Sequence, residues 1–159
     1  MSTAIQTYTL LDDDACEARI LRAREELGEK LVILGHHYQR DEVFRHANFT
    51  GDSLKLSRQA AASKADYIVF CGVHFMAESA VILGNDETAV ILPDLSAGCS
   101  LADMAELDQV QEAWQRFAAA TDEKIIPITY VNSKATIKAF CGQHDGACCT
   151  SSNARKVLE

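Results

Sequence analysis

Four short runs of apolar residues recur along this chain, and stretches with helical periodicity separate them. Each run is continuous instead of alternating between apolar and polar residues, which is typical of strands buried on both faces of a parallel sheet. Parallel strands also require long crossover connections, which the intervening helical stretches can supply. The pattern therefore predicts an α/β fold whose parallel sheet is covered by helices on both faces. The runs are KLVILG (30–35), DYIVFCG (66–72), TAVILP (88–93) and KIIPITYVN (124–132).

The helices expected between these runs are marked by their apolar spacing and by signals at their ends. Gly28 and Gly84 follow two of them, and Asp52 or Ser53 is placed to cap an alanine-rich helix. GACCTS (146–151) is expected to form a fifth strand. The expected helical segments are 13–28, 54–64, 74–84, 101–121, 133–142 and the residues from 152 onward, with 41–49 as a short helical or irregular piece.

Length, composition and net charge narrow the class of protein. The chain has 159 residues, 48% hydrophobic and 24% charged, as expected for a soluble globular protein of one domain or two small ones. Its net charge of −8 argues against a nucleic-acid partner, although a local site can still bind an anionic small molecule. We see no apolar run of membrane-spanning length and no signal peptide, so we expect a cytoplasmic protein without a membrane partner and with reduced cysteines.

A weak internal repeat suggests two similar α/β units. In both halves a strand, a polar cluster and a helix are followed by a second strand, a small polar turn and a second helix. We place the first unit at residues 1–100 and the second at residues 101–159. The second unit stops at Glu159, within a helical pattern and without a capping residue, which predicts that it is incomplete at its C-terminus.

Polar side chains follow each of the expected strands. Ligands of parallel α/β sheets bind beyond the carboxyl ends of the strands, so convergence of these clusters predicts a binding site there. A single strand-end histidine is more often structural, and the residues at 150–152 could simply cap the last helix or present donors to an anion. The clusters are His36-His37-Tyr38, Gly72-Val73-His74, Gly98-Cys99-Ser100, Tyr130-Val131-Asn132-Ser133 and Thr150-Ser151-Ser152-Asn153.

The six cysteines leave two interpretations open. Cys141, His144 and Cys148 lie in CGQHDGACC and could form a zinc- or thiol-binding module, although their spacing is unusual for zinc. Cys99, between Gly98 and Ser100, is the thiol best placed to reach a ligand beyond a strand. Cys99 alone cannot hold a metal and would need partners from elsewhere.

Six motifs in this order and spacing resemble the quinolinate synthase family. They are GHHYQRDEV, GDSLKLS, GVHFMAESA, LPDLSAGCSLADM, YVNSKATIKA and CTSSNA, and the similarity extends from about Lys30 to Glu159. The resemblance implies a transferase-type, condensing and cyclising enzyme of NAD biosynthesis. It would join iminoaspartate to dihydroxyacetone phosphate to make quinolinate, with a functional link to L-aspartate oxidase.

The same resemblance implies a fold and a cofactor. Family members consist of three-layer α/β units repeated around a pseudo-threefold axis, of which about two would be represented here. Each unit supplies one cysteine to a [4Fe–4S] cluster whose open iron acts as a Lewis acid, and Cys99 in AGCSLAD matches the first of these ligands.

Further residues carry over from the family motifs. His36 and Tyr38 match groups that bind substrate carboxylate and transfer protons, as suits an imidazole and a phenol. Ser53 matches a substrate-binding hydroxyl. Tyr130 matches a second catalytic tyrosine. The remaining substrate-binding positions are Val131, Asn132 and Ser151, together with His36 and Tyr130 themselves.

The sequence also departs from the family pattern. The second and third cluster cysteines are expected beyond Glu159, so this chain holds one of three iron ligands and part of the pocket. We therefore expect the chain alone to be inactive and poorly stable, since its face for a third unit would be exposed. An inactive α/β fragment stays open as an alternative, as does the zinc- or thiol-binding module.

Overall fold

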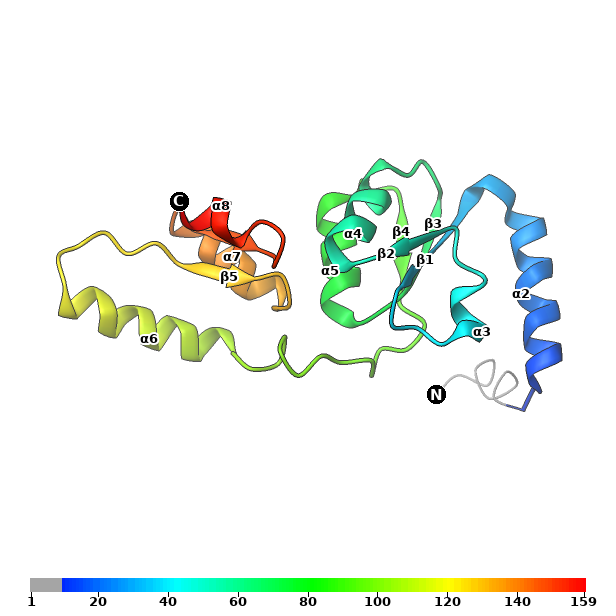
Figure 1. Cartoon of the computed structure of the whole chain (residues 1–159), viewed down its shortest axis with the longest axis horizontal. Coiled ribbons are helices and arrows are strands. Elements are labelled where there is room, and N and C mark those ends of the chain that lie inside the picture. Colours follow the sequence, from blue (N-terminus) through cyan, green and yellow to red (C-terminus); the bar gives the residue numbers. More distant parts are fainter. Residues whose placement is uncertain (1–9) are drawn as a thin grey trace.

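A four-stranded parallel sheet organises the first part of the chain (Figure 1). The structure is a computed structural model that describes residues 10–159. The strands lie in the order β2-β1-β3-β4, and every pair of neighbours is parallel. The predicted α/β class with a parallel sheet is thus confirmed. The strands are β1 (Leu31–His36), β2 (Phe49–Gly51), β3 (Tyr67–Cys71) and β4 (Ala89–Ile91).

Helices cover both faces of this sheet (Figure 1). The helices α4 (Ser53–Ala62) and α5 (His74–Leu83) pack against one face and against each other. On the other side lie α2 (Asp13–Leu27), the short 3₁₀ turn η1 (Gly28–Lys30) and α3 (Asp41–Phe44). The expected end signals are confirmed, because Asp52 caps α4 through the Lys55 amide at 2.8 Å and Gly28 ends α2 with a φ of 53°.

The core lies between the sheet and the α4–α5 layer. Leu34 and Phe70 from the central strands are fully buried there together with Leu56 of α4. Burial of each such side chain contributes roughly 1.5–3 kcal/mol. By contrast, none of residues 13–27 in α2 is buried. The helix α2 therefore rests on the outside of the unit, where Glu17 pairs with Arg45 at 3.0 Å.

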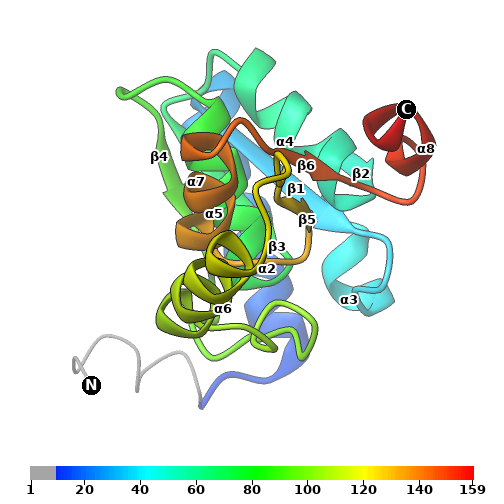
Figure 2. The same ribbon diagram turned by 90° about the vertical axis from the view of Figure 1, so that its left-hand side faces the viewer.

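A second, two-stranded parallel sheet follows after a long connection (Figure 2). The helix α7 packs on both of its strands, and Trp114 of α6 packs edge-on against Phe140 of α7. The helices α5 and α7 are in contact, so the two sheets are joined through them. The elements are α6 (Leu107–Ala120), β5 (Ile128–Tyr130), α7 (Ala135–Gln143), β6 (Ala147–Cys149) and α8 (Ala154–Leu158). The unit boundary at residue 100, the pseudo-threefold axis and the exposure of a face for a third unit stay predictions.

One strand was missed, and the bounds of two expected elements were wrong. The strand β2 was not predicted, because its three residues contain no apolar run and Phe49 is exposed at the sheet edge. The helix expected from residue 101 begins at Leu107, where Glu106 and Gln109 form a capping box. The strand expected at 124–132 is limited to β5, since only Ile128–Tyr130 pair with β6.

Among residues 10–159, no helix is long and apolar enough to cross a membrane.

Candidate active site

A cavity of about 610 Å³ lies where the carboxyl ends of β1, β5 and β6 meet the start of α4. This is the edge at which ligands of parallel sheets bind. Seven residues expected from the sequence line it: His36, Tyr38, Ser53, Tyr130, Val131, Asn132 and Ser151. The structure therefore brings together segments that are up to about 115 residues apart in the chain.

His36 ends β1 as a buried imidazole, with 6% of its surface exposed. Its ring packs on those of His37 and Tyr38, at centroid distances of 4.1 and 4.0 Å. Its Nδ1 has no hydrogen-bond partner among residues 10–159. Burial, with a smaller effect from His37, lowers the pKa of His36 to about 4, against a smaller raising effect of Asp52. His36 is therefore neutral at pH 7 and has a ring nitrogen available for a ligand.

Tyr38 lies beside His36 but is half exposed, with 51% of its surface accessible. Its hydroxyl donates a hydrogen bond to the sulfur of Met76 in α5, at 4.0 Å. Burial and the neighbouring Cys99 raise the pKa of the phenol. Tyr38 therefore keeps its proton at neutral pH and can act as a hydrogen-bond donor or general acid.

The opposite wall is built from the ends of β5 and β6. The Tyr130 hydroxyl and Ser151 Oγ are 2.6 Å apart and share a hydrogen bond. The Val131 amide donates to the Cys149 carbonyl at 2.8 Å, which holds the two strand ends together. Of the two roles left open for Thr150, Ser151 and Ser152, capping of α8 was wrong, because the N-cap of α8 is Asn153. The Asn153 side chain instead accepts from the Thr150 amide at 2.6 Å.

Cys99 lies in the connection after β4 and is partly buried against the core. It contacts the cavity wall through Asn132, whose Nδ2 donates to the Cys99 sulfur at 3.5 Å. Cys99 also lies close enough to Tyr38 to influence its pKa. The predicted metal-ligating thiol is thus adjacent to two predicted substrate-binding residues.

The sequence interpretation missed the contribution of α4. Besides Ser53, the cavity is lined by Lys55, Arg58 and Gln59 from this helix. Neither Lys55 nor Arg58 has an ion-pair partner within the described range 10–159. The signal that could have found them is their spacing of three residues, which places both cations on one helix face just after the Asp52 cap.

The alternative zinc module receives no support from the geometry. Cys141 is buried in α7, whereas Cys148 is exposed. His144 packs against Trp114 and Phe140, at centroid distances of 4.6 and 4.2 Å, and its Nδ1 is bonded to the Phe140 carbonyl. Within residues 10–159 no three histidine, cysteine or acidic side chains are grouped to hold a metal ion. Cys99 likewise would require ligands from outside this range to bind a cluster.

Comparisons with known proteins agree on one similarity. A protein-family model described as "Quinolinate synthetase A protein" matches residues 18–159. The chain is 58% identical to a quinolinate synthase from Acidobacterium capsulatum over 158 residues, covering 98% of this chain and 42% of that protein. It is 59% identical to a quinolinate synthase from Halalkalibacterium halodurans over 144 residues, or 90% of this chain and 39% of that protein. It shares 54% identity with a quinolinate synthase from Corynebacterium glutamicum over 156 residues, which cover 97% of this chain and 40% of that protein. The chain spans about two fifths of the length of these relatives.

Proposed function

The chain belongs to the quinolinate synthase family, and from this premise we propose that it forms the N-terminal part of an enzyme that condenses iminoaspartate with dihydroxyacetone phosphate. The product would be quinolinate, a precursor in NAD biosynthesis, and an L-aspartate oxidase would be the functional partner. One observation carries the proposal. The seven residues expected to bind substrate or transfer protons line one cavity, although they come from four separate segments of the chain.

Both proposed substrates are anions, and the cavity has matching cations. Lys55 and Arg58 carry the positive charge on the α4 side. An arginine can bind a carboxylate or a phosphate with two parallel hydrogen bonds, and a lysine adds a point charge. Opposite them, Tyr130 and Ser151 offer hydroxyl groups, and Asn132 adds an amide. We propose that these groups hold the charged ends of the substrates on either side of the cavity.

His36 and Tyr38 are suited to the proton transfers that such a condensation needs. Enolisation of the triose requires a base that removes a proton from carbon, and the loss of water requires an acid that protonates the departing hydroxyl. The neutral His36 imidazole can accept the first proton, since burial keeps it unprotonated. The Tyr38 phenol, whose pKa is raised, can supply the second proton.

Cys99 is the proposed cluster ligand of this chain. When bound, a [4Fe–4S] cluster with one open iron would supply a Lewis acid. The partly buried thiol fits one ligand position, because it lies beside Asn132 and near Tyr38. The other two cysteines would come from the part of the family's longer chain that this chain does not cover. We therefore expect no cluster and no activity from this chain alone.

Anaerobic reconstitution with iron and sulfide tests this proposal. It is performed on this chain alone and on this chain mixed with the remaining C-terminal part of the Acidobacterium relative, and iron content and visible absorption are measured. Cys99→Ala is the test variant. Cys16→Ala is the matched control, since Cys16 lies on α2 and does not line the cavity.

We expect a brown four-iron species only in the mixture, lost in Cys99→Ala and retained in Cys16→Ala. Quinolinate formation should follow the same pattern. Iron retained after Cys99→Ala would contradict the ligand assignment. Metal bound by this chain alone and lost on changing Cys141 and Cys148 would favour the zinc module.

A further inference from the structure

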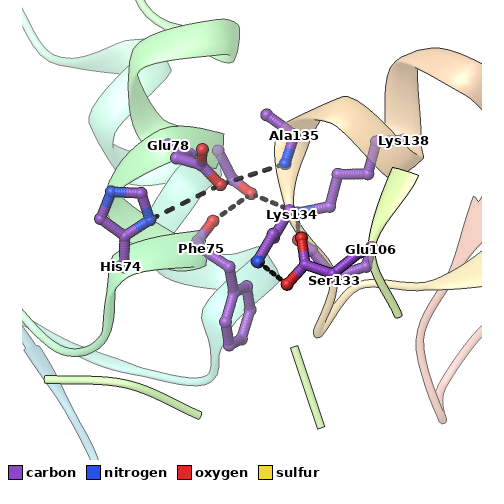
Figure 3. A network of polar contacts seen from close by, with 9 residues as sticks. His74, Phe75, Glu78, Glu106, Ser133, Lys134, Ala135 and Lys138 are labelled. Atoms are coloured by element: carbon purple, nitrogen blue, oxygen red, sulfur yellow. Dashed lines mark hydrogen bonds and ion pairs between the residues drawn. The ribbon is translucent and has the colours of Figure 1, made fainter. Parts of the chain in front are cut away.

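A network of polar contacts outside the cavity joins α5 to the start of α7 (Figure 3). It connects the first sheet to the second, since its partners are more than 50 residues apart in sequence. Its central members are Glu78 and Ser79 on α5 and Ser133, Ala135 and Lys138 around the start of α7. None of these five residues lines the cavity.

Glu78 acts as a cap for a helix in the other part of the molecule. Its Oε2 accepts a hydrogen bond from the amide of Ala135, the first residue of α7, at 3.1 Å. The side chain of Lys134, the N-cap residue of α7, makes no capping bond in the described part of the chain. The carboxylate of Glu78 also places negative charge at the positive end of the α7 dipole. The first turn of α7 is thus held by α5.

Lys138 makes the reciprocal connection. From the next turn of α7 its ammonium donates to the Ser133 carbonyl at 2.9 Å and to Ser79 Oγ at 3.1 Å. It also lies 5.3 Å from the centre of the Phe75 ring, within cation–π range. Ser79 in turn donates to the Phe75 carbonyl at 2.8 Å. The half-buried ammonium therefore has partners on both helices.

These contacts act on the residues next to the cavity. Ser133 follows Asn132 directly, and its Oγ donates to the Tyr130 carbonyl at 2.8 Å. Its amide donates to the Val131 carbonyl at 2.9 Å, so the turn after β5 is closed by Ser133. On the other side, α5 carries Met76, which accepts the hydrogen bond of Tyr38. Both walls of the cavity are thereby held in place by contacts with one helix, α5.

We propose that Glu78 and Lys138 are positioning residues. They set the distance between the segment from Tyr130 to Asn132 and the cavity residues contributed by the first sheet and α4. They do so by tying the start of α7 and the Ser133 turn to α5. The inference deepens the proposed function, because the positioned residues are those proposed to bind substrate. Two other contacts lie nearby, His74 with Glu78 at 3.9 Å and Lys134 with Glu106, and neither includes a bond to Ser133.

Amide hydrogen exchange measured by NMR tests the inference directly. In Glu78→Ala, the Ala135 amide loses its acceptor and should exchange about tenfold faster. In Lys138→Met, the Ser133 carbonyl loses the bond from the ammonium, which loosens the turn, so the Ser133 amide that donates to the Val131 carbonyl should exchange about tenfold faster. Glu78→Gln and Lys138→Arg retain an acceptor and a cationic donor, so each should restore most of the protection. Lys134→Met is the matched control, since it removes a neighbouring lysine whose hydrogen bond and ion pair are to Glu106 and not to Ser133 or Ser79.

Quinolinate binding, followed by titration calorimetry on the same variants mixed with the C-terminal part of the Acidobacterium relative, separates positioning from simple stability. Lys138→Met should weaken binding about tenfold at a temperature where all the variants remain folded, and Lys138→Arg should recover it. Unchanged Ala135 and Ser133 exchange in the Ala and Met variants, or equal acceleration in Lys134→Met, would overturn the inference. If the mixture that contains the unaltered chain does not bind quinolinate, that result counts against the proposed function, and the exchange rates still decide on positioning.

Discussion

Lowering the pH from 7 to 5 should cost this protein about 2 kcal/mol of unfolding free energy through His36 alone. The cause is the position of this imidazole at the end of β1, where 6% of its surface is exposed and its Nδ1 has no partner among residues 10–159. Burial lowers the pKa of His36 to about 4 in the folded protein, from an ordinary value of 6.5. The unfolded chain therefore binds the His36 proton more tightly than the folded chain does.

The sign and the size of this change in unfolding free energy follow from the difference between the two pKa values. The stability contribution of a neutral His36 is fully present above pH 6.5 and is lost progressively as the pH falls toward 4. Between pH 7 and pH 5 the two pKa values give a change of about 2 kcal/mol. With a urea dependence of about 1–3 kcal/mol per molar, this corresponds to a midpoint shift of about 1 M.

The assay is urea unfolding followed by far-ultraviolet circular dichroism at both pH values, for the unaltered chain and for His36→Phe. The phenylalanine ring can keep the packing on His37 and Tyr38, and it cannot be protonated. Carboxylates elsewhere titrate in both proteins, so the difference between their pH dependences isolates His36. NMR titration of the His36 ring gives the pKa independently.

Equal losses of stability in the two proteins on going to pH 5 would refute the reasoning. So would an NMR midpoint for His36 near its ordinary value. Either result would mean that water or a nearby carboxylate such as Asp52 compensates for burial of the ring. The claim that burial keeps His36 unprotonated below its ordinary pKa would then lose its physical basis.

Three other substitutions test the fold and the site. Gly146→Ala should destabilise the protein by about 1–3 kcal/mol in urea unfolding, because a Cβ there would lie 2.0 Å from the Pro127 carbonyl oxygen. Leu34→Ala should cost about 2–5 kcal/mol in the same assay, since the side chain is fully buried at the centre of the core. Tyr130→Phe should leave stability within about 1 kcal/mol but weaken quinolinate binding by the mixture with the C-terminal part about tenfold, because it removes the hydroxyl paired with Ser151; calorimetry and urea unfolding separate the two effects.

Much of the fold was predictable because the central strands carry strong local signals. β1 and β3 are continuous apolar runs, and the helices around them end at Gly28 and begin at Asp52. The strand β2 was not predictable in this way. Its three residues take their conformation from pairing with β1, which is a tertiary effect that their own composition does not reveal.

The site was predictable to a similar extent. The polar residues at the strand ends could be placed together, because parallel strands end at one edge of a sheet. Distances across the cavity could not be predicted, since the contact of Asn132 with Cys99 depends on how a long connection folds back. The partner of Glu78 on α7 lies 57 residues away and could not be identified from local sequence.

The second sheet has a consequence for the order in which the molecule folds. A sheet of two strands such as β5–β6 is marginally stable in water unless other elements pack against it. The four-stranded sheet has its own core and leaves the ribosome first, so it can fold before α7 has been synthesised. The helix α5 then offers the side chains, such as Glu78, against which α7 and the second sheet pack. The binding cavity is therefore completed at the end of folding, by the part of the chain that is least able to fold by itself.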